Sequence, residues 1–257
     1  MNDRQLNATT QRWFVIAGGI GLLPILLVGY LMTRALPPPS PMSSGARIAQ
    51  LLSEHPNVVQ AGCVILMMGF ALYALWGSVI TLWIWRMESS RQWPLLTIAS
   101  AVLLAVQVTM LELIPWSLAT ATYRASSISP DITRIFSDFA WFGLIWIFPP
   151  FLLWFGVVAM AMLRDRSTPR TFPRWLGWFT AAVGLHFVLA GFMGVSKSGP
   201  LSSDGIIAYW GVLMVFGIWE VVFDVHLLKA IGAEERRLRA ISSPEAEPVP
   251  QRSPVLA

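Results

Sequence analysis

Four ionisable side chains lie well inside apolar stretches of this 257-residue sequence: Glu112, His186, Glu220 and Asp224. A charge at the centre of a membrane helix costs about 2.5 to 3.5 kcal/mol on insertion scales, so each such residue is a candidate for a functional role. We therefore treat these four as the candidate catalytic residues.

Glu220 and Asp224 form the central pair of this set, because residues four apart share one face of a helix. Two neighbouring carboxyl groups in a dry site do not easily ionise together, so one is expected to hold a proton near neutral pH. A proton donor beside an acceptor suits acid-base catalysis, with His186 orienting either group or relaying its proton. It would equally suit proton-coupled transport. In the plainest alternative, Asp224 reaches the membrane surface and Glu220 bonds a neighbouring helix.

Pro149 and Pro150 fall near the middle of another apolar stretch. They remove two amide donors and clash with preceding carbonyl groups, so the helix should kink there. Backbone freed by a kink is tolerated at this depth only where protein or a water-filled cavity covers it. We predict a central cavity bordered by Pro149, Pro150, His186 and Glu220. Four deep tryptophans would shape its walls through their ring faces, namely Trp76, Trp146, Trp154 and Trp219.

Glu112 lies nearer the predicted outer surface than the other three candidates. With Trp116, Tyr123, Arg124 and Asp138 it is expected to form an outward-facing polar cluster, in which Arg124 pairs with one of the acids. In strongly tilted helices, Glu112 would instead join the central site.

Other kinds of site are disfavoured by what the sequence lacks. The single cysteine, Cys63, allows no intrachain disulfide and no cysteine-based zinc site. There is no nucleotide-binding glycine loop, no histidine-rich set and no nucleophile elbow. A basic and aromatic nucleic-acid motif is also missing. We therefore predict no metal, no cofactor and no nucleic-acid partner.

The elements that position these residues follow from composition. Hydrophobic residues make up 55% of the chain and charged residues only 12%, against about 25% charged in soluble domains. Six stretches reach the roughly 20 apolar residues that a bilayer core requires, and backbone groups in lipid must bond within their own helix. The fold class is therefore an all-α, polytopic transmembrane helical bundle. The six spans are expected at 13–34, 58–85, 95–118, 139–163, 175–195 and 206–228.

The predicted spans make one transmembrane domain over residues 1–232, followed by a disordered tail over 233–257 that is rich in charge, Pro and Ser. With the amino end inside, 13 of the 18 basic residues lie on the cytoplasmic side. This bias predicts that both termini are cytoplasmic, in a bacterial inner membrane. Short helices are expected in two outer loops, one from 46 to 55 with Ser44 as its cap and one beginning at Ser129.

Three segments carry a resemblance to known proteins: Phe172 to Gly177 (FPRWLG), Phe216 to Trp219 (FGIW) and Leu227 to Ile231 (LLKAI). In these the chain resembles uncharacterised small polytopic membrane proteins of actinobacteria and proteobacteria. In its buried carboxyl groups and aromatic content it is also similar to integral-membrane terpenoid cyclases. That likeness implies an acid that protonates an isoprenoid in a dry pocket whose aromatic faces stabilise the cation.

These features favour an intramembrane acid-base enzyme, a terpenoid cyclase or isomerase. Its expected partners are a lipophilic small-molecule substrate and the membrane lipids. The alternative is a proton-coupled small transporter, or an accessory membrane protein that binds lipid or a partner subunit without catalysis. The lack of an inverted repeat disfavours the transporter.

Overall fold

The computed structural model describes residues 3–34, 36, 38–88 and 93–242, and the regular structure in those ranges is entirely helical. Six helices are long and apolar enough to cross a membrane, which confirms the predicted all-α, six-span bundle. They run over Asn7–Met32, Pro56–Met87, Leu95–Tyr123, Pro130–Arg164, Arg174–Gly194 and Ile206–Ala240. The chain is thus a multi-pass membrane protein.

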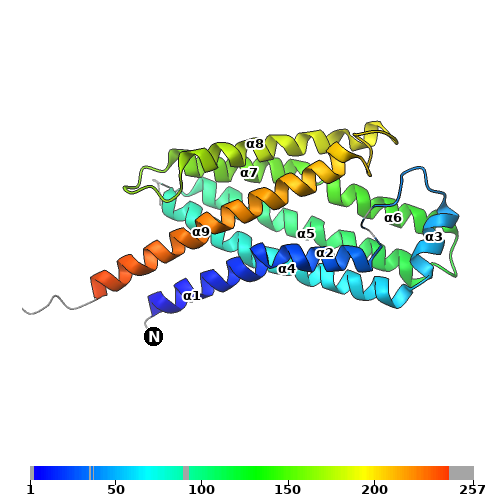
Figure 1. Ribbon diagram of the computed structural model, residues 1–257, viewed down its shortest axis with the longest axis horizontal. Coiled ribbons are helices and arrows are strands. Elements are labelled where there is room, and N and C mark those ends of the chain that lie inside the picture. The colour runs from blue at the N-terminus through cyan, green and yellow to red at the C-terminus, as the bar shows by residue number, and fades with distance from the viewer. Residues whose placement is uncertain (1–2, 35, 37, 89–92, 243–257) are drawn as a thin grey trace, which may run out of the picture.

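The spans lie roughly along one long axis, and the beginning of the first and the end of the last project from the same end of the bundle (Figure 1). Which membrane face that end occupies stays a prediction. In order, the elements are α1 (Asp3–Val15), η1 (Ile16–Ile20), α2 (Leu22–Met32), α3 (Gly45–Ser53), α4 (Pro56–Met87), α5 (Leu95–Tyr123), α6 (Pro130–Ile145), α7 (Phe148–Arg164), α8 (Arg174–Ala190), η2 (Gly191–Val195), η3 (Ile206–Gly211) and α9 (Val212–Ser242).

The first span is interrupted by the π-helical turn η1 between α1 and α2. The N–H of Gly21 donates to the carbonyl oxygen of Ile16 at 2.8 Å, one residue farther back than in an α-helix. Gly19 has φ −106° and ψ −106°, outside the helical region. Such π-turns are rare and occur frequently at functional sites.

The fourth span breaks at Trp146 and Ile147, where α6 ends and α7 begins. Pro149 and Pro150 lie in the first turn of α7, where a missing N–H leaves no helical bond unmade. The predicted interruption of this span is confirmed, just before the two prolines.

Both predicted outer helices are present. The hydroxyl of Ser44 accepts a hydrogen bond from the Arg47 N–H at 3.3 Å and caps α3. Ser129 caps α6 in the same way, through the Asp131 N–H at 3.4 Å. The second of these helices is not a separate element, because α6 continues directly into the fourth span.

The prediction of a disordered tail from residue 233 is wrong for its first ten residues, since α9 stays helical through Ser242. The charged residues are accommodated because Glu235 pairs with Arg12 of α1 at 2.7 Å and with Arg239 one turn along α9. Residues 243–257 lie outside the described part of the chain.

Candidate functional site

The acid pair lies on the inward face of α9. The side chains of Glu220 and Asp224 are both 0% exposed. Oδ1 of Asp224 accepts a hydrogen bond from the indole Nε1–H of Trp76 on α4 at 2.6 Å. Neither oxygen of Glu220, nor Oδ2 of Asp224, has a hydrogen-bond partner among the described residues. The ion pairs in that part of the chain involve neither acid.

The π-turn of the first span makes room for this arrangement. A side chain at Gly19 would place its Cβ 2.7 Å from Cδ1 of Trp76 and closer still to Oδ2 of Asp224. Gly18 is equally confined, because its position faces the backbone of Leu72 on α4. Bare backbone of the first span therefore meets the Asp224 carboxyl group of the last.

Three tryptophans, all 0% exposed, pack together, and one of them is Trp76, the donor to Asp224. The ring centroids of Trp76 lie 5.9 Å from those of Trp154 and of Trp219, which are 6.2 Å from each other. Trp154 Nε1–H donates to the Ser100 hydroxyl at 3.1 Å, and Trp219 Nε1–H donates to the Thr180 hydroxyl at 3.0 Å. Buried indoles usually find such partners. These contacts fix the orientations of the two rings.

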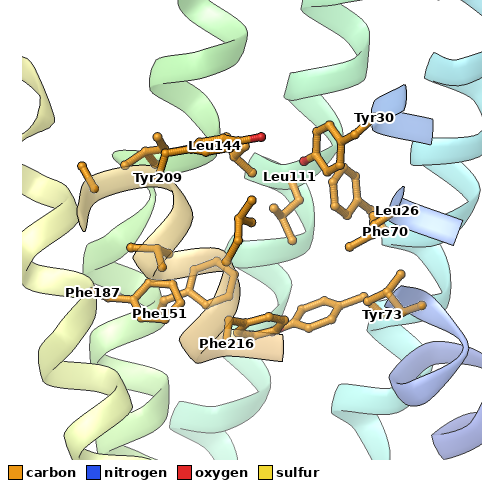
Figure 2. Close-up of a pocket in the computed structure, with 15 residues that line it drawn as sticks. Leu26, Tyr30, Phe70, Tyr73, Leu111, Leu144, Phe151, Phe187, Tyr209 and Phe216 are labelled. Atoms are coloured by element: carbon orange, nitrogen blue, oxygen red, sulfur yellow. The ribbon is translucent and has the colours of Figure 1, made fainter. Parts of the chain in front are cut away.

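An apolar cavity of about 90 Å³ lies beside these tryptophans. It is lined by side chains of α2, α4, α5, α6, α7, α8, η3 and α9. In the view of Figure 2, the rings of Tyr73 and Phe216 lie at one end of the cavity, and Tyr30 and Tyr209 lie toward the other. Tyr73 also lies within electrostatic range of Glu220. The cavity and the acid pair are thus neighbours, and Tyr73 and Phe216 form the floor of the cavity on the side of Glu220.

The residues predicted to border this cavity do not line it. Pro149, Pro150, His186 and Glu220 are not among the lining side chains; Phe151, Phe187 and Phe216 line it instead. Each of these three lies one residue to one turn from a predicted position. Consecutive helical residues point about 100° apart, so Phe151 and Phe187 can face the cavity while Pro150 and His186 face elsewhere. Phe216 shares a helix face with Glu220 but lies one turn nearer the cavity.

Gln107 is a functional candidate that the hydropathy reading missed. It is 0% exposed on α5, and its Oε1 accepts a hydrogen bond from the Tyr73 hydroxyl at 2.8 Å. Its Nε2 donates to the carbonyl oxygen of Pro150 at 3.1 Å. A polar amide midway along an apolar span was a visible signal. It joins the cavity floor to the fourth span, beside the break.

His186 does not join the acid pair. It is half-buried on α8, and its Nε2 has no hydrogen-bond partner among the described residues. It faces Gly211, where an added Cβ would lie 3.4 Å from Nε2. Gly211 precedes Glu220 by nine residues, about 13 Å along a helix. The hydrogen bond between Trp219 and Thr180 fixes this offset of α8 relative to α9.

The outward cluster and Trp146 also differ from expectation. Glu112 is half-buried and forms no hydrogen bond or ion pair with its side chain among the described residues. Arg124 lies over the ring of Tyr123, 5.8 Å from its centroid, instead of pairing with an acid. Asp138 pairs with Arg134 at 3.6 Å. None of the four tryptophans predicted as walls lines the cavity: Trp146 is 47% exposed at the helix break, and the other three pack behind the lining residues Tyr73 and Phe216.

A second, polar cleft of about 270 Å³ opens between α1, α4 and α9, at the end where the termini project. Trp83 Nε1–H donates to Oε1 of Gln11 at 3.1 Å, and the Arg86 guanidinium lies 4.5 Å above the Trp83 ring. Glu234 also lines this cleft. Ile231 of its wall follows Asp224 by seven residues, or two helical turns.

The described residues contain no group of three or more His, Cys, Asp or Glu side chains placed to hold a metal ion. Comparison of the chain with known protein families, curated proteins and solved structures finds no match.

Proposed function

We propose that this multi-pass membrane protein is an intramembrane acid-base enzyme acting on a small lipophilic molecule. The observation that carries the proposal is the acid pair: two fully buried carboxyl groups, with three of their four oxygens lacking a hydrogen-bond partner in the described residues. Two uncompensated carboxylates at this depth would cost many kcal/mol, so the pair holds at least one proton. A proton held in such surroundings is available for chemistry.

The hydrogen bonds suggest different roles for the two acids. The Trp76 N–H stabilises negative charge on Asp224, whereas no described donor stabilises it on Glu220. Glu220 is therefore the proton donor, and Asp224 is the acceptor. In an isomerisation, Glu220 protonates one alkene carbon, using the electron pair of the double bond. Asp224 then removes a proton from a neighbouring carbon, and the double bond re-forms.

The surroundings favour a cationic intermediate of this kind. Trp76, which donates to Asp224, packs against Trp154 and Trp219, and the faces of such rings attract positive charge. After each cycle, Asp224 loses its proton and Glu220, one helical turn away, regains one, and exchange with water during this reset brings solvent hydrogen into the pair. No net proton is consumed, so the reaction requires no outside acid or base.

The substrate class follows from the cavity. Its lining is apolar except for tyrosine hydroxyls, which favours a hydrocarbon such as an isoprenoid. Its volume of about 90 Å³ is smaller than the roughly 300 to 1,000 Å³ of typical ligand pockets. An isoprenoid therefore has to displace Phe216 at the floor, and the same movement brings it to Glu220.

The test is incorporation of solvent deuterium. The purified protein is incubated with bacterial isoprenoid lipids in heavy water, and the products are measured by mass spectrometry. Wild-type protein should add deuterium to an alkene, and Glu220→Gln and Asp224→Asn should each lower that rate at least a hundredfold. Glu112→Gln is the matched control. Equal labelling with and without protein, or full activity in both variants, would sink the proposal.

Proton-coupled transport is the second candidate, because the polar cleft and the apolar cavity lie on opposite sides of the acid pair. Protein in liposomes under a pH gradient should then move protons together with a solute, and Asp224→Asn should stop that movement. A flux that ignores the gradient counts against this candidate.

A further inference from the structure

The loop that joins α7 to α8 is held in shape by one buried carboxylate. Asp165 is 2% exposed, and its two oxygens accept backbone hydrogen bonds from Ser167 and Thr171, each at 2.9 Å. Burial raises the pKa of Asp165, but these hydrogen bonds outweigh it and leave the pKa below its ordinary value. Phe172, 2% exposed, packs its ring 5.6 Å from that of Phe223 on α9. The loop is therefore fixed at both ends.

This fixed loop carries an uncompensated positive charge. Four exposed arginines stand on it or at its ends, namely Arg164, Arg166, Arg170 and Arg174. None of them forms an ion pair within the ranges that the structure describes, whereas Arg12, Arg34 and Arg134 each pair with an acid. The loop's own carboxylate, Asp165, is turned inward to the backbone amides. The four guanidinium groups are thus left facing solvent.

Both helices that the loop joins carry an exposed apolar face that ends at one of these arginines. On α8, Arg174 shares a face with Trp178 and Leu185, which are 64% and 65% exposed. On α7, Arg164 follows Leu153 by eleven residues, or about three turns, and Leu153 is 58% exposed. The two helices pack against each other, and the exposed apolar face of each runs along the helix toward the loop.

We propose that this arginine loop (residues 164–174) binds the headgroup of an anionic phospholipid, whose acyl chains lie along the exposed faces of α7 and α8. The loop joins two membrane-spanning helices, so it lies at headgroup level, and exposed Trp175 and Trp178 are typical of that interface. Arginine forks match the geometry of a phosphate group. A phospholipid matches both the charge and the apolar faces, whereas a soluble anion would use the arginines only.

The test compares lipid binding by the full-length purified protein in detergent, using native mass spectrometry with phosphatidylglycerol and phosphatidylcholine. Wild-type protein should retain phosphatidylglycerol preferentially. The double variant Arg166→Gln/Arg170→Gln should weaken that binding about 30-fold, the loss expected from two headgroup-level arginines. The matched control is Arg47→Gln/Arg124→Gln, which removes two exposed arginines at the other end of the bundle and should change binding less than twofold.

Asp165→Asn separates an organised site from general attraction. The substitution makes the loop more positive but weakens the bonds that shape it, so phosphatidylglycerol binding should fall several-fold, whereas general attraction predicts a rise. Unfolding curves of every variant establish folding, and the double arginine variant tests the proposal even if Asp165→Asn does not fold.

Three outcomes overturn the inference. One is equal retention of the two lipids, which would point to an acidic protein partner. Another is an equal loss in the control double variant. The third is displacement of the lipid by inorganic phosphate at the same concentration, which would indicate a site for a free ion. The acid pair takes no part in these measurements, so this inference stands or fails separately from the proposed enzyme.

Discussion

Gly19→Ala is the sharpest test of the contact between the first and last spans. The new Cβ would lie 2.7 Å from Cδ1 of Trp76 and closer to the Asp224 carboxyl group, so a buried ring or the acid has to move. Overpacking of this kind costs about 1 to 3 kcal/mol. Losing the bond from Trp76 to Asp224 adds about 1 to 3 kcal/mol, because both groups are left buried and unpaired. Together they give about 2 to 6 kcal/mol, with a central expectation of about 4 kcal/mol.

Thermal unfolding of the purified protein in detergent measures this effect. For a domain of this size, about 4 kcal/mol corresponds to roughly 8 to 16 °C in Tm. The matched control is Gly156→Ala on α7, where an added Cβ meets nothing within 4 Å. Alanine is the better helix former, so this control should be neutral or slightly stabilising.

A double-mutant cycle decides the mechanism. If Gly19→Ala acts by breaking the bond between Trp76 and Asp224, its cost should shrink when Trp76 is already phenylalanine. Equal shifts of Tm for Gly19→Ala and Gly156→Ala would refute the reasoning. Full additivity with Trp76→Phe would show that the glycine is needed for some other reason.

Two further predictions concern Gln107 and Asp165. Gln107→Leu leaves the Tyr73 hydroxyl and the Pro150 carbonyl without their side-chain partner, and it should lower the free energy of unfolding by about 2 to 4 kcal/mol; an unchanged unfolding curve would mean that water replaces the amide. Because hydrogen bonds hold the pKa of Asp165 below its ordinary value, its stabilisation should be present above about pH 4 and be lost as the pH falls through the lower folded-state value. Unfolding measured from pH 2.5 to 6 should show this loss in the wild type but not in Asp165→Asn, and parallel curves would contradict it.

The spans and the inward direction of the acids were predictable from the sequence. Hydropathy over 20 residues is a strong signal in a bilayer, and Glu220 and Asp224 had no inexpensive alternative to the interior of the bundle. The interruption just before Pro149 and Pro150 was predictable for the same kind of reason, because proline lacks the amide that a continuous helix needs.

The details of the site could not be predicted from the sequence and required the structure. Gly18 and Gly19 suit ordinary helix packing as well as a π-turn, so their spacing does not predict the contact with Asp224. Counting residues from the predicted ends of the last two spans puts His186 at a depth similar to that of the acids. That count assumed level ends, but α9 continues to Ser242 while α8 begins at Arg174, so equal counts do not mean equal depth.

The pairing of the first span with the last also has a consequence for biosynthesis. The ribosome delivers the π-turn of the first span early, and the helix that carries both acids emerges after the five other spans. The indole of Trp76 is therefore already within the membrane when Asp224 is inserted, and its Nε1–H can bond the carboxyl group at once. A nascent chain that lacks the sixth span would leave the buried indole N–H of Trp76 without its carboxyl partner.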